Sequence, residues 1–274
     1  MKILIILGSE CYNHPPVMMG KIIGGAVTGS VDAVVVVPKD GHLENAQAVA
    51  EQASLDMFEI QPRILIEEGE TTQVIKRLLT NETYQLVIVN ADRILRLRKT
   101  VDIDPILIKQ SEISLLIAKN TKPKIDRILL CTACKENDYR LVQQTAKLAA
   151  SLGASVTLLH VFAGAVPTMY TGLEQIDETV EELLQTDTSY AQHLRKDVEI
   201  LQENKIKSEV KIRRGIPIEE IVRETQIENY DLAVIGTSDF NQGLKEMLLG
   251  NLTNKIIDRV ELPVLVVGRR DMEP

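Results

Sequence analysis

Short apolar runs rich in β-branched residues alternate along the chain with stretches of helical periodicity. Runs such as 33–37 and 232–236 are almost free of polar residues, which is typical of strands buried on both faces of a parallel sheet. Between the runs, apolar residues such as Leu141 and Leu148 recur at helical spacing, and Gly153 follows where a helix end favours glycine. This alternation predicts right-handed βαβ crossovers and an α/β fold.

The pattern of predicted strands occurs twice in the chain. The matched pairs are 2–7 with 127–132, 32–37 with 155–160, 64–69 with 210–215, 84–89 with 230–235, and 112–117 with 261–266. A repeat of this length indicates two copies of one structural unit. We therefore expect a Rossmann-like α/β fold of two tandem five-stranded, mostly parallel sheets with helices on both faces, in domains 1–120 and 121–274.

The second copy carries an additional acidic segment, 163–189, after its second predicted strand. Apolar residues repeat there at helical spacing, and the segment contains no Lys or Arg. The apolar positions are Leu173, Ile176, Val180, Leu183 and Leu184. Two interpretations remain open: a helix lying over the sheet with a solvated acidic face, or an element that docks a partner or acts as a lid.

Composition narrows the classes of function. The formal net charge of −8 argues against nucleic-acid binding, which needs a basic surface. No apolar run approaches the roughly 20 residues of a membrane span, so we expect a cytoplasmic protein without a membrane partner.

Cys131 and Cys134 have the C-x-x-C spacing of redox and metal sites. No second Cys or His pair lies at ligand spacing elsewhere, and Cys131 falls inside a predicted strand. Buried structural thiols are the simpler interpretation, and we expect no metal.

Glycines mark the segment where a ligand is expected. Gly236 ends a predicted strand, and Gly243, Gly250 and Asn251 lead into a helix with an apolar face. In open α/β sheets, ligands bind beyond the carboxyl ends of strands, where glycines and a helix N-terminus expose backbone N–H groups.

Together with the closing strand 263–267, this glycine-containing segment resembles the C-terminal signature of the universal stress protein family. That signature is an ATP-binding loop with three glycines, the last followed by Ser or Thr. Gly236 and Gly250 match the first and third glycines, whereas Asp239 and Phe240 stand around the place of the second, and Asn251 replaces the Ser or Thr. The resemblance covers nearly the whole chain as a tandem pair.

The resemblance implies an adenine-nucleotide site in the second half. The residues it assigns to the cofactor are Thr132, His160, Val161, Gly236, Gly243, Gly250 and Asn251. The family's Asp at the end of the first strand falls on Ala133, and Asp239 brings negative charge towards the phosphates, so we expect only weak binding of ATP or AMP. In the first half, the matching segment 90–99 lacks glycine and is basic. Its cations form either a solvated helix face or an anion clasp.

The resemblance also implies a stress-response protein that acts through a protein partner and is not an enzyme. The two halves of the chain are expected to pair through their last strands as an internal dimer. Whether two such chains form a further homodimer is left open. The four histidines lie in different predicted elements without a triad pattern, and no GKS or GKT loop is present, so no catalytic residue is assigned. The alternatives are a universal stress protein that binds and slowly hydrolyses ATP, and a flavin- or nucleotide-dependent enzyme on a similar fold.

Overall fold

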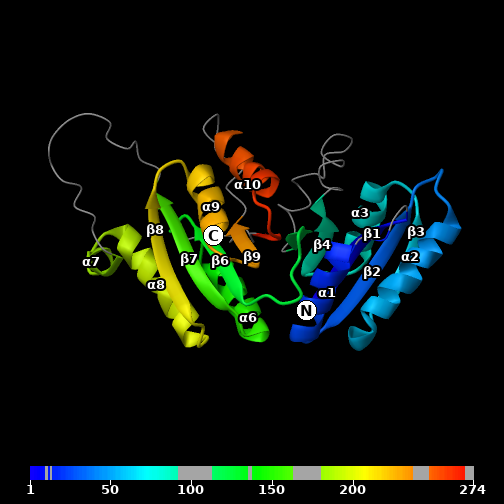
Figure 1. Ribbon diagram of the computed structural model, residues 1–274, viewed down its shortest axis with the longest axis horizontal. Coiled ribbons are helices and arrows are strands. Elements are labelled where there is room, and N and C mark those ends of the chain that lie inside the picture. Colours follow the sequence, from blue (N-terminus) through cyan, green and yellow to red (C-terminus); the bar gives the residue numbers. More distant parts are fainter. Residues whose placement is uncertain are drawn as a thin grey trace. The chain divides into compact units, whose positions relative to one another are not determined.

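The computed structural model describes residues 1–9, 12, 14–91, 113–134, 138–162, 180–236 and 247–268 (Figure 1). The chain divides into two compact units, one formed by 1–124 with 261–274 and the other by 125–260. Each unit is a mostly or wholly parallel sheet with helices on both faces, which confirms the predicted fold class.

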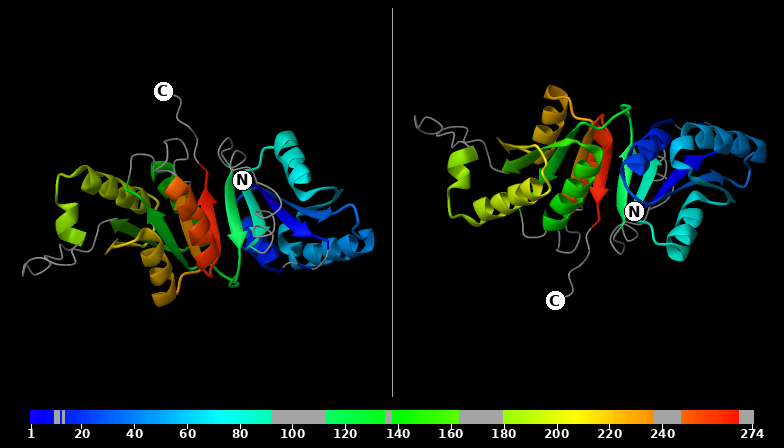
Figure 2. Two further views of the ribbon diagram at one scale, coloured as in Figure 1. Left: turned by 90° about the horizontal axis from the view of Figure 1, so that it is seen from above. Right: turned by 90° about the horizontal axis from the view of Figure 1, so that it is seen from below.

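The first unit contains a parallel sheet in the order β3-β2-β1-β4-β5. Its elements are β1 (Lys2–Gly8), α1 (His14–Ala26), β2 (Ser30–Val37), α2 (Leu43–Asp56), the 3-10 turn η1 (Phe58–Ile60), β3 (Arg63–Glu68), α3 (Thr71–Asn81), β4 (Leu86–Asn90) and β5 (Ser114–Ala118). Helices α1 and α2 cover one face of the sheet and α3 covers the other (Figure 2). Central strand β1 is buried from Ile3 to Gly8, as its apolar sequence predicts.

The second unit repeats this plan with the order β9-β6-β7-β8, again parallel. Its elements are β6 (Arg127–Thr132), α6 (Tyr139–Leu152), β7 (Ser155–Phe162), α7 (Val180–Leu184), α8 (Ser189–Glu203), β8 (Ser208–Arg214), α9 (Pro217–Ile227), β9 (Leu232–Gly236) and α10 (Met247–Arg259). Helices α6 and α8 lie on one face of the sheet, and α9 and α10 lie on the other (Figure 2).

The last strand of the chain, β10 (Val264–Val267), pairs with the first unit. It runs antiparallel to β5, with Val264 opposite Ile117 and Val266 opposite Leu115. The predicted pairing of the last strands of the two repeats is therefore confirmed. Because β10 follows α10 directly in sequence, the chain returns from the second unit to the first at residues 260–261.

Two local signals in the sequence have the expected structure. Gly153 follows α6 with φ of 68°, a left-handed conformation that glycine adopts without the steric cost of a Cβ. Pro217 stands in the first turn of α9, where its missing N–H costs no hydrogen bond.

The predicted acidic helix is described only in part. Its residues Val180 to Leu184 form α7, whereas 163–179 lie outside the described residues. Arg195 of α8 donates hydrogen bonds to the carbonyls of Leu184 and Thr186, which fixes the end of α7 to α8. Among the described helices, none combines the length and the hydropathy needed to cross a membrane.

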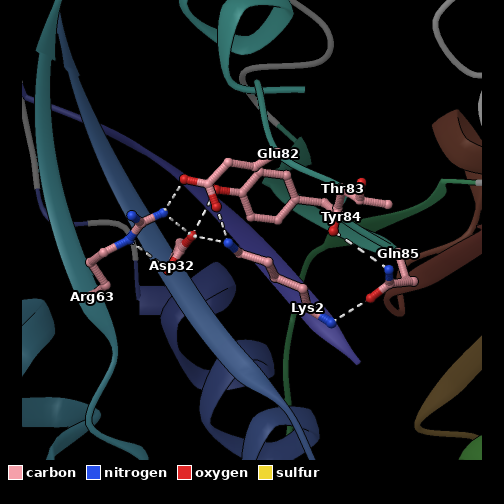
Figure 3. Close-up of polar contacts among 7 residues, drawn as sticks. All are labelled: Lys2, Asp32, Arg63, Glu82, Thr83, Tyr84 and Gln85. Carbon is pink, nitrogen blue, oxygen red and sulfur yellow. Dashed lines mark hydrogen bonds and ion pairs between the residues drawn. The ribbon is translucent and has the colours of Figure 1, made fainter. Parts of the chain in front are cut away.

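A buried tyrosine and a buried carboxylate anchor the first unit near the start of β1 (Figure 3). The Tyr84 hydroxyl donates to Asp32 at 2.7 Å, and Arg63 binds the same carboxylate through two nitrogens. Burial alone would raise the pKa of Asp32, but the hydrogen bonds from Arg63 and Tyr84 hold it below its usual range. Lys2 pairs with Glu82 and also lies over the Tyr84 ring.

The second unit builds the same arrangement from a different acid. The Tyr230 hydroxyl donates to Glu224 of α9 at 2.9 Å, and Lys211 and Arg213 of β8 bind that carboxylate at 2.9 and 2.7 Å. Arg127 lies over the Tyr230 ring and pairs with Glu228, as Lys2 and Glu82 do in the first unit. The internal repeat therefore extends from the strands to a buried polar cluster.

Candidate functional site

The carboxyl ends of β6, β7 and β9 form one edge of the second sheet. Strand β6 lies between the other two, with Thr132 opposite His160 and Cys131 opposite Ile235. The chain leaves β6 through α6 towards β7, and it leaves β9 towards α10 on the opposite face. This is a topological switch point, the position at which open α/β sheets bind ligands.

His160 holds the end of β6 in place. Its Nδ1 lies 2.9 Å from the carbonyl oxygen of Thr132, and the side chain is buried. Burial lowers the pKa of His160, so the ring is neutral at pH 7 and Nδ1–H donates to the carbonyl. These contacts are those of a structural histidine that shapes the rim of the site.

The turn after β6 is fixed by Asp138, a residue without an assigned role in the sequence analysis. Its Oδ2 accepts a hydrogen bond from the backbone N–H of Ala133 at 2.8 Å, and the carboxylate is buried just before α6. Cys134 adopts φ of 51°, a left-handed conformation that is uncommon for a residue with a Cβ. Its Sγ lies 3.5 Å from the hydroxyl of Thr132, so the turn folds back on the strand end.

An aromatic cluster lies beside this turn. The rings of His160 and Phe162 from β7 and of Tyr190 from α8 have centroids 4.5 to 4.8 Å apart. At these separations the three rings are in direct contact. Helix α8 is thereby packed onto the strand that carries two of the predicted site residues, His160 and Val161.

Asp197 of α8 is a second buried acid that the sequence analysis does not single out. It is 4% exposed, and burial followed by the charge of Asp138 raises its pKa to about 7. The spacing of Tyr190, Leu194, Asp197 and Leu201 places Asp197 on the apolar stripe of α8, and this spacing is a signal from which its burial could have been predicted.

The three glycines predicted to bind the cofactor lie in different environments, and one of them is outside the described residues. Gly236 ends β9, and an added Cβ there would meet its nearest neighbour, Leu141 Cδ2, at an ordinary contact distance of 3.5 Å. Gly250 lies within α10, whereas Gly243, Asp239 and Phe240 are outside the described residues.

The expected helix start at Asn251 is wrong. Helix α10 already includes Met247, so Asn251 is a helical residue and cannot be the N-cap. The intervening Gly250 does not stop the helix, because a helical glycine costs only about 1 kcal/mol relative to alanine.

The C-x-x-C cysteines are protonated thiols. Burial raises the pKa of both Cys131 and Cys134 to about 12, and both are free. In the part of the chain that the structure describes, no group of three or more His, Cys, Asp or Glu side chains is arranged to hold a metal ion. The basic cluster expected in 92–99 falls outside that part.

The switch-point edge and the duplicated sheets define a tandem α/β protein of the Rossmann-like class. A family model described as the universal stress protein family matches residues 124–268, more than half of the chain. The chain belongs to the universal stress protein family.

Individual relatives agree with this assignment. A universal stress protein of Methanocaldococcus jannaschii is 26% identical over 157 residues, which cover 57% of this chain and 90% of that protein. The crystal structure of a universal stress protein from Archaeoglobus fulgidus aligns with a TM-score of 0.62 at 15% identity and covers 98% of this chain and 97% of its own.

A putative universal stress protein from Pseudomonas aeruginosa aligns with a TM-score of 0.70 at 17% identity, over 98% of this chain and 94% of its own. At these identities the structures show the fold alone. They match the chain over both of its units.

Proposed function

We propose that this protein is a stress-response protein that acts through protein partners, without catalysis, and carries a weakened adenine-nucleotide site in its second unit. The observation that carries the proposal is the edge where Thr132, His160 and Gly236 meet at the switch point of the sheet. Family membership supplies the expectation that the ligand there is ATP or AMP.

The shape of the edge supports a nucleotide. Gly236 carries no Cβ, which favours close approach of a ligand to the backbone at the end of β9. Helix α10 follows β9 after the intervening segment, and a helix N-terminus favours the negative charge of phosphates.

Two features weaken the site. Ala133 replaces the carboxylate expected beside the ribose, and its N–H is already bonded to Asp138. Asp239 falls in the segment that the family resemblance assigns to the phosphates, and a carboxylate there would repel them. One lost hydrogen bond and one close like charge are each worth roughly 1 to 3 kcal/mol, which together lower affinity about a hundredfold.

The chemistry of the edge supports a non-catalytic role. The Nδ1 of His160 is engaged with the Thr132 carbonyl, and both cysteines hold their protons at neutral pH. A general base or thiolate nucleophile needs the opposite properties, an available nitrogen or a lowered thiol pKa.

Isothermal titration with ATP and with AMP tests the nucleotide site. Gly236→Ala is the informative variant, because the added methyl fits the fold but occupies space at the strand end. Gly25→Ala is the matched control, since its Cβ also finds ordinary room, 3.7 Å from Ile60, in the first unit. We expect the first substitution to weaken binding about tenfold and the second to leave it unchanged.

Asp239→Gly supplies the opposite test. Removing the carboxylate should tighten ATP binding about tenfold and AMP binding less, because ATP carries more negative charge. Submicromolar ATP binding that persists in Gly236→Ala would place the nucleotide elsewhere and contradict the proposal. Multiple turnover of ATP by the purified protein would contradict the non-catalytic part.

A further inference from the structure

Two polar groups on the inner face of α8 have no hydrogen-bond partner among the described residues. Asp197 is 4% exposed and its Oδ2 finds no donor. The Tyr190 hydroxyl is buried beside the Cys134 thiol, but the two groups are not oriented to form a hydrogen bond. The two residues are two helical turns apart, so they face the same corner of the sheet.

Among the residues that the structure describes, the groups that face Asp197 bring no compensating positive charge. They are the Asp138 carboxylate from the start of α6, the Cys134 thiol from the turn after β6, and the Tyr190 hydroxyl from α8 itself. His160 of β7, which contacts Tyr190, is neutral. No described Lys or Arg forms an ion pair with Asp197. An ionised Asp197 would therefore be a buried, unpaired anion next to another carboxylate.

This corner is continuous with the candidate nucleotide site. Asp138 fixes the N–H of Ala133, the residue that directly follows Thr132. A second negative charge on Asp197 repels the carboxylate that holds this turn, and it favours movement of α8 towards water. Because Tyr190 packs on His160, the same movement loosens the histidine that holds the Thr132 carbonyl.

We propose that the proton on Asp197 regulates the nucleotide site: α8 closes the corner while Asp197 is neutral and loosens it when Asp197 ionises. The inference rests on the proposed function for its ligand, an adenine nucleotide. Because the closed corner is the form that holds the strand end for the nucleotide, a bound nucleotide and a retained proton favour each other.

The direction of the effect follows from linkage. Burial and Asp138 raise the pKa of Asp197 to about 7, so proton loss falls in the physiological range. Nucleotide affinity should accordingly decrease as pH rises from 6 to 8. In Asp197→Asn the neutral amide cannot ionise, and this part of the pH dependence should disappear.

The first test needs no nucleotide. Amide hydrogen exchange of α8 is measured between pH 6 and 8 and corrected for the intrinsic rate, in the wild type, in Asp197→Asn and in Glu199→Gln. Glu199 is an exposed acid on the same helix and serves as the control. We expect corrected exchange to rise at least threefold in the wild type and in Glu199→Gln, and to stay constant in Asp197→Asn.

Carboxyl NMR titration of the wild type tests the same switch without a variant, so it does not depend on whether Asp197→Asn folds. An Asp197 carboxyl that titrates near neutral pH supports the switch, and one that titrates near its ordinary value overturns it.

The second test is ATP titration across the same pH range. Loss of affinity in the wild type and Glu199→Gln, but not in Asp197→Asn, supports the coupling. Parallel curves for all three proteins overturn it, because phosphate titration then accounts for the whole effect. Absence of ATP binding at every pH overturns the proposed function instead, and the exchange experiment alone then decides whether the proton controls the corner.

Discussion

Asp197 lies on the buried face of α8, although aspartate is usually charged and exposed. The dependence of protein stability on its protonation is opposite to that of most acids. Its pKa is raised in the folded protein, so the folded state holds the proton more tightly than the unfolded chain. The corresponding stability is fully present below pH 4 and is lost as pH rises to about 7. Most acids in salt bridges act in the opposite direction.

Asp197→Asn should therefore become more stable relative to the wild type as pH rises. Between pH 4 and 7, the wild type is expected to lose up to about 4 kcal/mol of unfolding free energy that the variant retains. Urea unfolding of both proteins across this range measures the difference. A constant difference would contradict the raised pKa.

The two thiols of the C-x-x-C motif should be slow to react. With a pKa near 12, about one thiol in ten thousand is ionised at pH 8. In a Cys11→Ser background, labelling of Cys131 and Cys134 by a thiol reagent is expected to be at least a hundredfold slower in the native than in the unfolded protein. Rapid native labelling would restore the redox interpretation.

Individual residues of the candidate site are harder to predict from the sequence than the strands that carry them. Thr132, His160 and Gly236 are predicted from their place at strand ends, and the structure brings those ends to one edge. The roles of Asp138 and Asp197 depend on which helices cover the edge, and contacts between α6 and α8 are not encoded by spacing within either helix. The apolar stripe of α8 signals the burial of Asp197, whereas its proximity to Asp138 is a tertiary property.

At the scale of elements, the strands can be predicted well from the sequence because burial in a sheet restricts their composition. A strand covered on both faces, such as β1 or β9, must be apolar at consecutive positions, and few loops share that composition. The start of α10 is less predictable, because glycine weakens a helix without preventing it and packing of Ile256, Ile257 and Val260 outweighs the cost.

The duplicated tyrosine clusters give a prediction at this scale. Glu224→Ala removes the acid that Tyr230, Lys211 and Arg213 share. Lys211, largely buried, then keeps its pairing with the half-exposed Glu228 but loses its buried partner. We expect the unfolding free energy to fall by about 3 to 5 kcal/mol. Asp32→Ala should act similarly in the first unit, whereas Glu209→Ala, an exposed position of β8, should have little effect.

Both polar clusters should also lose their stabilising effect at low pH. The pKa values of Asp32 and Glu224 are held below their usual range, so the stability they contribute is present above about pH 4 and is lost at lower pH. Acid unfolding of the wild type should begin at a lower pH than in Tyr84→Phe or Tyr230→Phe, each of which lacks one of the hydrogen bonds that lower these pKa values. Coincident acid transitions would show that the hydroxyls do not contribute.

At the scale of the whole molecule, the first unit depends on a strand that lies far away in the sequence, β10. Strand β10 pairs with β5 and belongs to the unit that begins at Met1. A chain ending at Val260 should show increased amide exchange in β4 and β5 while β6 to β8 remain protected. A chain ending at Gly268 keeps β10 and is the control. Equal protection of β5 in both would contradict this dependence.

The return of β10 has a consequence for the protein as it is being made. A ribosome releases the N-terminal residues first, so β1 to β5 emerge long before their sixth strand has been translated. During that interval β5 has an unpaired edge that another extended segment can occupy. Strands β6, β7 and β8 can pair with one another before the chain is finished, whereas β5 gains its partner β10 only with residues 264–267. The N-terminal unit is thus expected to complete its sheet only after β10 has been translated, and nascent chains stalled before Val264 should recruit chaperones through β5.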